Sequence, residues 1–137
     1  MIGRHKSDNV YNEDMESLKT YIQKQKKSPF VDLLLFFMRE KKLDSPTVYK
    51  RALMDRKLFS KLISDSTYRP SKKVVCTLAL ALHLDQKESK TFIKRAGYIL
   101  TSGATFDLTI RYCIEHKIYD IYQVQALLEK VHLTLID

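Results

Sequence analysis

Residues that form tight turns are scarce in this chain. Its 137 residues include three glycines and three prolines. A β protein with many strands needs a turn about every ten residues, and such turns draw on glycine and proline. The shortage therefore predicts an all-α fold, in which a few short loops join helices. A chain of this length buries enough apolar surface to fold without metals or disulfides.

The prolines indicate where several helices begin, because each lies beside a serine. The pairs are Ser28-Pro29, Ser45-Pro46 and Pro70-Ser71. A serine at the N-cap with a proline at the first helical position satisfies one free backbone N–H and omits another. The first two pairs predict helices that begin near residues 29 and 46. Ser71 predicts a helix over residues 72–83.

Three aspartates predict further helix starts. Asp55 is placed to cap a helix over residues 56–64. Asp85, with Glu88 three residues later, has the spacing of a capping box, and that helix ends at Gly97. Asp120 opens a last helix, whose apolar stripe comprises Ile121, Val124, Leu128 and Val131.

Apolar periodicity predicts the remaining helices. Residues 106–117 repeat apolar side chains at helical spacing. Residues 12–26 form a lysine-rich amphipathic pattern with Met15, Leu18 and Ile22 on the inward side. The whole pattern predicts about five short central helices, with additional helices toward both ends.

Positive charge is concentrated in the first part of the chain. The chain has 24 basic and 16 acidic residues, a net charge of +8. Residues 1–75 hold 17 basic and 9 acidic side chains, whereas residues 76–137 hold 7 of each. Within residues 39–73 the counts are 11 and 4. This block predicts a surface for phosphate or another polyanion, and a solvated basic face without a partner is the alternative.

Residue types that carry catalysis or bind metals are isolated. Cys76 and Cys113 lie singly in apolar stretches, which predicts reduced core cysteines of a cytoplasmic protein. No histidine pair has metal-binding spacing, and no glycine-rich phosphate loop or hydrolase motif is present. We therefore expect no enzymatic activity, no metal and no cofactor.

The sequence shows no pattern typical of a signal peptide or of a membrane-spanning helix. The first residues lack the apolar core of a signal peptide. The strongest apolar run, residues 33–38, is far shorter than the roughly 20 residues that span a bilayer. We expect a cytoplasmic protein that makes no membrane contact.

The centre of the chain has a sequence pattern that can be compared with a known family. Residues 39–64, REKKLDSPTVYKRALMDRKLFSKLIS, resemble the phage-repressor (lambda repressor-like, XRE) helix-turn-helix family, and the resemblance extends over residues 31–84. A narrower resemblance, over residues 31–130, is to a bacterial helical domain that often follows a macro domain. It rests on VYKRA at 48–52, DRKLFSK at 55–61, RPSKK at 69–73, ALAL at 79–82, RAGY at 95–98 and FDL at 106–108.

The resemblance implies a division of the chain. Residues 1–28 would be a basic helical arm, and residues 29–137 a single helical domain. Within that domain the helix-turn-helix core is residues 30–84, and residues 85–137 are a C-terminal helical extension. The implied function is a DNA-binding transcriptional regulator of bacterial or phage type that binds double-stranded DNA as a homodimer, paired through its C-terminal helices.

The resemblance also implies which residues bind DNA. The helix at 55–64 would lie in the major groove, with Met54, Phe59 and Leu62 toward the core. Arginine reads guanine in bidentate fashion, and lysines bind bases or phosphates. The implied DNA-binding residues are Ser45, Asp55, Arg56, Lys57, Ser60, Lys61, Tyr68, Arg69, Lys72 and Lys73.

Four apolar residues depart from the family pattern. Tyr49 and Leu53 stand where the family has small residues, and Leu58 and Ile63 occupy positions that are usually polar. These departures leave two alternatives open. One is non-specific binding of nucleic acid. The other is a protein-protein interaction module, such as an adaptor of a bacterial defence or toxin-antitoxin type system, on an inherited helix-turn-helix fold.

Overall fold

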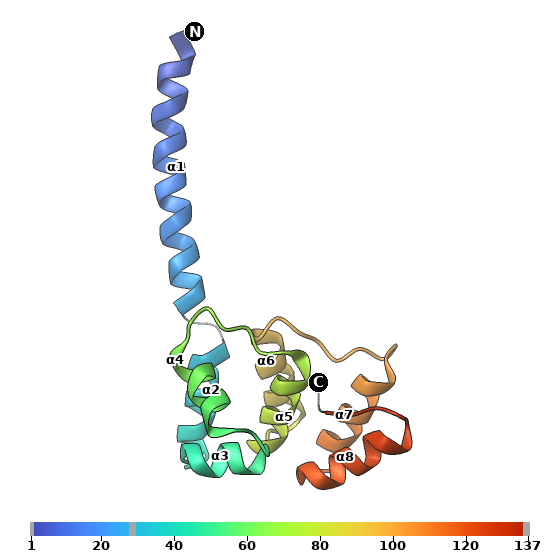
Figure 1. Ribbon diagram of the computed structural model, residues 1–137. Coiled ribbons are helices and arrows are strands. Elements are labelled where there is room, and N and C mark those ends of the chain that lie inside the picture. The colour runs from blue at the N-terminus through green and yellow to red at the C-terminus, as the bar shows by residue number, and fades with distance from the viewer. Residues whose placement is uncertain (1, 28–29, 136–137) are drawn as a thin grey trace.

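The protein is all-α in the computed structural model (Figure 1). The backbone is described for residues 2–27 and 30–135, and the side chains for residues 12–24 and 30–135. These residues form eight helices and no strand, which confirms the predicted fold class. The helices are α1 (Ile2–Lys27), α2 (Phe30–Glu40), α3 (Ser45–Arg51), α4 (Arg56–Ser64), α5 (Lys72–Ala81), α6 (Gln86–Arg95), α7 (Thr105–Glu115) and α8 (Ile121–Lys130).

Helix α5 lies at the centre of the core. Its seven consecutive residues from Val75 to Ala81 are all buried. A helix that is apolar around its circumference has to be surrounded by other elements. Accordingly, α5 packs against α3, α6 and α8, and Figure 1 shows α5 and α6 between α2–α4 on one side and α7–α8 on the other.

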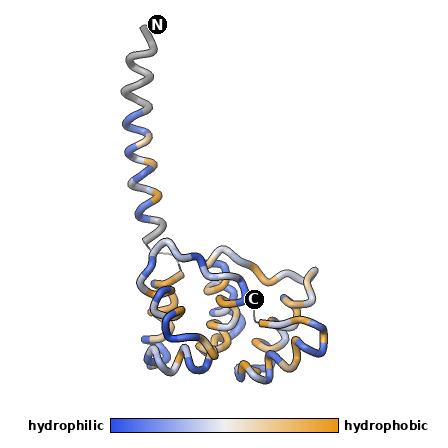
Figure 2. Tube along the Cα trace, viewed as in Figure 1, coloured by the Kyte–Doolittle hydropathy of each residue, from blue (hydrophilic) through white to orange (hydrophobic). Residues whose placement is uncertain are grey.

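Helices α2 to α8 share one hydrophobic core. Buried apolar side chains form a single cluster that extends from Phe30 to Leu128. Aromatic contacts join α2 to α6, with the ring centroids of Phe30 and Phe92 5.0 Å apart and those of Phe37 and Phe92 6.2 Å apart. Figure 2 shows the strongly hydrophobic stretches within this body, whereas the coloured part of α1 alternates hydrophilic and hydrophobic residues.

Both cysteines are core residues, as the sequence predicts. Cys76 and Cys113 are buried and free. Burial raises the pKa of the Cys76 thiol to about 12 and also raises that of Cys113. Neither thiol is therefore a nucleophile near neutral pH. In the described part of the chain, no helix combines the length and the apolar character that crossing a membrane requires.

Four of the predicted helix starts are confirmed by their cap hydrogen bonds. In each case a side-chain oxygen accepts a backbone N–H of the first turn, at 2.6–3.2 Å. Glu88 completes a capping box by accepting the backbone N–H of its own cap residue at 3.0 Å. The cap residues are Asp55, Ser71, Asp85 and Asp120.

The predicted cap at Ser45 is wrong. Asp44 is the N-cap of α3, and its carboxylate accepts the backbone N–H of Thr47 at 2.9 Å. Ser45 becomes the first helical residue and Pro46 the second. Proline is tolerated there because the first-turn N–H groups have no partner within the helix. The other predicted start, at Ser28-Pro29, lies outside the described residues.

Six helices end in the same turn, and five of these turns contain no glycine. The N–H of Leu53 donates to the carbonyl of Lys50 at 3.1 Å, and the N–H of Met54 to the carbonyl of Tyr49 at 2.8 Å. This is the Schellman pattern, which places one residue at positive φ. The residues at positive φ are Lys42, Leu53, His83, Gly97, Lys117 and His132. The scarcity of glycine therefore does not limit the number of turns.

An apolar residue follows each of these turns and packs onto the core. The six are Leu43, Met54, Leu84, Tyr98, Ile118 and Leu133. Their burial stabilises the turn and offsets the conformational cost of a positive φ at a side chain other than glycine. Helix ends in this protein are therefore set by tertiary packing as well as by local sequence.

Two predictions about apolar stripes are wrong. Val131 follows the last residue of α8 and is 41% exposed, because the stripe ends with the helix. On α1, Leu18 and Ile22 are 49% and 40% exposed, and Met15 is only half-buried. They do not face a core, since α1 extends away from the other helices (Figure 1).

Candidate nucleic-acid interface

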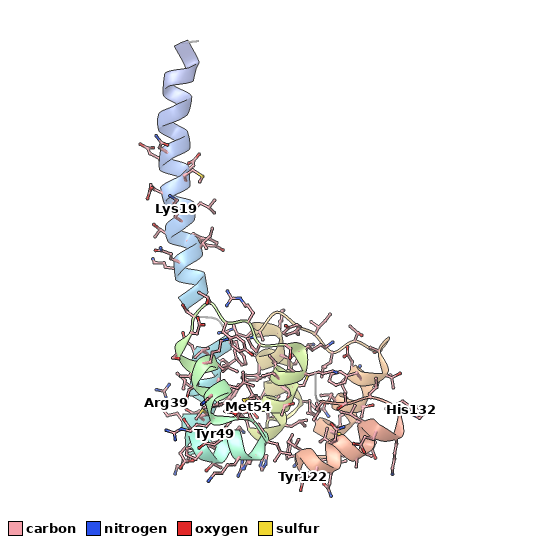
Figure 3. All side chains as sticks on the ribbon, viewed as in Figure 1. Lys19, Arg39, Tyr49, Met54, Tyr122 and His132 are labelled. Carbon is pink, nitrogen blue, oxygen red and sulfur yellow. The ribbon has the colours of Figure 1, made fainter. Side chains whose placement is uncertain are left out.

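Helices α3 and α4 form a closely packed pair joined by residues 52–55. Val48 of α3 and Leu62 of α4 are almost fully buried. The half-buried ring of Tyr49 packs on Phe59 with the ring centroids 5.8 Å apart. Tyr49 thus fills the space between the two helices, where it lies close to the turn that contains Met54 (Figure 3).

The outer face of α4 is cationic and polar. Arg56, Lys57, Ser60 and Lys61 are all exposed, whereas Phe59 on the opposite side is buried as the sequence predicts. The helix has the sequence RKLFSKLIS and contains no acidic residue. Three positive charges over nine residues therefore face solvent together.

The two aspartates that flank α4 are occupied by backbone contacts. Asp55 caps the helix and accepts the N–H of Lys57 at 2.6 Å. Asp65 accepts both the hydroxyl of Thr67 at 2.6 Å and its backbone N–H at 2.9 Å, and these hydrogen bonds lower the pKa of Asp65 below its ordinary value. Asp55 is exposed, and its carboxylate orders the helix N-terminus.

The loop after α4 continues the basic surface. The Nζ atom of Lys61 lies 5.0 Å from the centroid of the Tyr68 ring, a cation–π distance. Tyr68 is half-buried against the core, so it holds the loop beside the last turn of α4. Arg69 follows, exposed, and its Nη1 donates to the carbonyl of Ser66 at 3.2 Å.

Lys72 has a different role from the phosphate contact that the resemblance implies. Its Nζ lies 2.8 and 2.9 Å from the two carboxylate oxygens of Asp107, which is 2% exposed. Thr101 donates its backbone N–H to the same carboxylate at 2.7 Å. Burial raises the pKa of Asp107, but the hydrogen bonds from Lys72 and Thr101 outweigh burial and lower it. Lys72 therefore joins α5 to α7, and its charge is balanced by Asp107, unlike the exposed cations of α4.

The structure gathers some of the predicted residues and separates others. Arg56, Lys57, Ser60 and Lys61 share one face of α4, and Tyr68 touches Lys61. Ser45 is exposed at the start of α3, and Lys73 is half-buried in the first turn of α5.

Three exposed lysines on α6 were missed by the sequence reasoning, because residues 76–137 sum to zero charge. They are Lys87, Lys90 and Lys94. Their spacing of three and four residues places them on one side of the helix, and that spacing is the signal that could have found them.

Nothing among the described residues suggests a metal site, since no group of three His, Cys, Asp or Glu side chains is arranged to hold an ion. No protein-family model, curated protein or solved structure matches the chain. The case for a function therefore depends on the shape and charge of the surfaces themselves.

Proposed function

We propose that the protein is a DNA-binding transcriptional regulator of phage-repressor helix-turn-helix type, and that α4 enters the major groove. The observation that carries the proposal is the exposed face of α4, which presents three cations and no acid. An α-helix with its side chains is about 10–12 Å in diameter, which suits a major groove about 12 Å wide. The paired packing of α3 behind α4 supports the same function, because it holds α4 in a fixed orientation.

The side chains of this face divide by chemistry. Arg56, in the first turn of α4, is suited to bind O6 and N7 of a guanine in bidentate fashion. Lys57 and Lys61 provide point charges for phosphates or base edges, and Ser60 adds a hydroxyl between them. Arg69, in the following loop, is placed for a backbone phosphate.

The proposal includes a homodimer in the cytoplasm of a bacterium or of a cell infected by a phage. One helix in the groove reads only a few base pairs. Two helices about 34 Å apart read successive turns on one side of the duplex, which is how proteins of this type gain specificity.

Selection from a random duplex pool at moderate salt tests this function directly. We expect enrichment of a palindrome whose half-sites are separated by about one helical turn. A variant with Arg56, Lys57 and Lys61 changed to alanine should enrich nothing. If the native chain also enriches no sequence, specific readout by α4 is excluded.

The alternative function is a protein-protein interaction module, and one observation favours it. Leu53, in the turn directly before α4, is 51% exposed, which is unusual for a leucine beside a nucleic-acid surface. This alternative predicts no salt-dependent affinity for DNA even at about 50 mM salt. It also predicts that Leu53→Ser abolishes binding of the protein partner without unfolding the domain.

A further inference from the structure

The apolar stripe of α1 has no cover within the described part of the chain. Leu18, Ile22 and the neighbouring Tyr21 are all exposed, and Tyr21 is 63% exposed. The side chains of α1, including the labelled Lys19, stand clear of the body in Figure 3. A helix in a protein owes most of its stability to packing of an amphipathic face, so an uncovered stripe calls for a partner.

A groove between α6 and α7 is the second uncovered apolar surface. Its volume is about 670 Å³. Its apolar lining includes Ile99, which is 62% exposed and is among the most exposed large hydrophobic side chains of the described residues. Leu100 beside it is half-buried, whereas Ile93 and Ile114, which also line the groove, are buried at 1% and 5% exposure. This surface is suited to the apolar face of a helix.

The edge of the groove is strongly basic. Lys87, Lys90 and Lys94 line it from α6, and Arg111 lines it from α7, against a single acid, Glu115. The first and last of these lysines are seven residues apart, which is about 10.5 Å along the helix axis. Among the described residues none of these four cations takes part in an ion pair. An occupant of this groove should therefore be apolar on one face and acidic beside it.

Residues 12–18 of α1 have this chemistry. Residues 12–18 carry three acids, Glu13, Asp14 and Glu16, and no basic residue. At about 100° per residue, Asp14 and Glu16 lie on opposite sides of the stripe that begins at Met15, and Glu13 lies on the far side. Lys19 lies between Met15 and Glu16, where it pairs with Glu16. Glu16 makes only one weak, exposed ion pair in its own helix, 3.9 Å from Lys19. Its carboxylate is therefore accessible to a cationic groove.

We propose that the segment of α1 around residues 12–22, whose acidic part is residues 12–18, docks from one copy of the chain in the α6–α7 groove of a second copy. The helix covers the apolar lining with Met15, Leu18 and Ile22, and Asp14 and Glu16 meet the lysines of α6. The donor is a second copy because α1 leads into α2 through only residues 28–29 and extends away from its own body (Figure 1). When each copy gives its α1 and receives the other, the contact closes into a two-fold dimer.

Pairing of two α1 helices with each other explains less of the structure. It would bring Asp14 near Lys19 of the second copy and cover the stripe. It would leave the groove open and the four cations around it without an acidic partner. Docking of α1 in the groove covers both the α1 stripe and the groove, and it brings the acids of α1 to the lysines of α6.

Charge reversal in the full-length chain tests the dimer. We expect analytical ultracentrifugation to show a dimer whose dissociation constant rises about tenfold or more in Lys90→Glu/Lys94→Glu and in Asp14→Lys/Glu16→Lys. Combining the four changes should restore the dimer, which a mere loss of folding would not. A matched control, Lys117→Glu/Lys130→Glu, reverses two exposed charges outside the groove and should leave the constant unchanged. A chain that is monomeric at all concentrations, or four changes that fail to restore the dimer, would overturn the proposal.

Zero-length cross-linking identifies the contact. In a mixture of unlabelled and isotope-labelled chains, a carbodiimide should join carboxylates of residues 12–18 to lysines of α6 in mixed-isotope pairs. Links confined to one chain would mean that α1 folds back onto its own groove. Links between Asp14 and Lys19 of two chains would mean that α1 pairs with α1. Either result overturns the proposal and leaves the DNA-binding test on α4 unaffected.

Discussion

The three exposed cations of α4 and the three exposed lysines on one side of α6 lie in different surroundings. On α4 the cations alternate with exposed serines, and the face is polar throughout. On α6 the lysines border an apolar groove. A polar cationic face suits a phosphate backbone, whereas a cationic edge beside an apolar lining suits an amphipathic acidic helix. Net charge alone therefore does not identify the binding partner of a surface, because the polarity of the side chains between the charges also decides it.

Lys72 shows a third use of positive charge, as a structural ion pair between α5 and α7. Removal of its partner Asp107 should lower the stability of the fold without changing DNA binding by α4. Asp107→Ala leaves the Lys72 ammonium, 30% exposed, without its buried partner. Because loss of one member of a buried pair typically costs about 3 kcal/mol, less where water reaches the charge, we expect a loss of about 2 kcal/mol of unfolding free energy. Urea denaturation measures it, and the affinity for DNA below the transition should stay unchanged.

The same pair predicts how stability depends on pH. The pKa of Asp107 in the folded state lies below its ordinary value of 3.8. The stabilisation is therefore complete above pH about 4 and is lost as the pH falls through the folded pKa. Urea midpoints measured from pH 6 downward should fall more steeply for the native chain than for Asp107→Asn. Parallel curves would contradict the role given to the pair.

Arg56→Ala tests whether α4 reads bases. We expect a loss of about 1 to 3 kcal/mol on the selected site and relaxed preference at one base position. Lys61→Ala should instead weaken all sequences alike and reduce the salt slope by about one. Fluorescence anisotropy with selected and random duplexes measures both. Equal effects of the two changes on both duplexes would contradict base readout.

Substitutions in the turns next to α4 and α6 should change the free energy of unfolding least. Leu53, before α4, and Gly97, after α6, occupy the same positive-φ position. Leu53→Gly should raise the free energy of unfolding by about 0.5 kcal/mol, because it relieves the strained φ but frees the unfolded chain. Gly97→Ala should lower it by about 1 kcal/mol, and only through φ, since its Cβ would meet no atom within 4 Å. Thermal unfolding of both variants, measured against the native chain, checks the two expected changes in stability.

Local features of this fold were predictable from the sequence. The caps at Asp55, Asp85 and Asp120 follow from a side chain and a backbone N–H only two or three residues apart. The error at Ser45 shows the limit of such reasoning. Asp44 and Ser45 are both good cap residues, and only the path of the loop decides between them.

Non-local features were not predictable. Lys72 and Asp107 are 35 residues apart, and only the packing of α5 on the rest of the core brings them together. Leu53 takes a conformation typical of glycine because Met54 packs beyond it. For the site, the cations of α4 could be read from the sequence. The α6–α7 groove could not, because it requires two helices and the loop at residues 99–100.

The salt dependence of DNA binding is the sharpest test of whether α4 binds DNA. Two variants of equal charge are compared with the native chain: Arg56, Lys57 and Lys61 to alanine on α4, and Arg95, Lys117 and Lys130 to alanine on exposed positions outside α4 and the groove. We expect the α4 variant to reduce the slope of log K against log salt by up to about 2.7 for each bound copy of the chain, and the other variant to leave the slope unchanged. Equal slopes for the two variants, or no binding by the native chain at about 50 mM salt, would contradict the assignment of α4 to DNA.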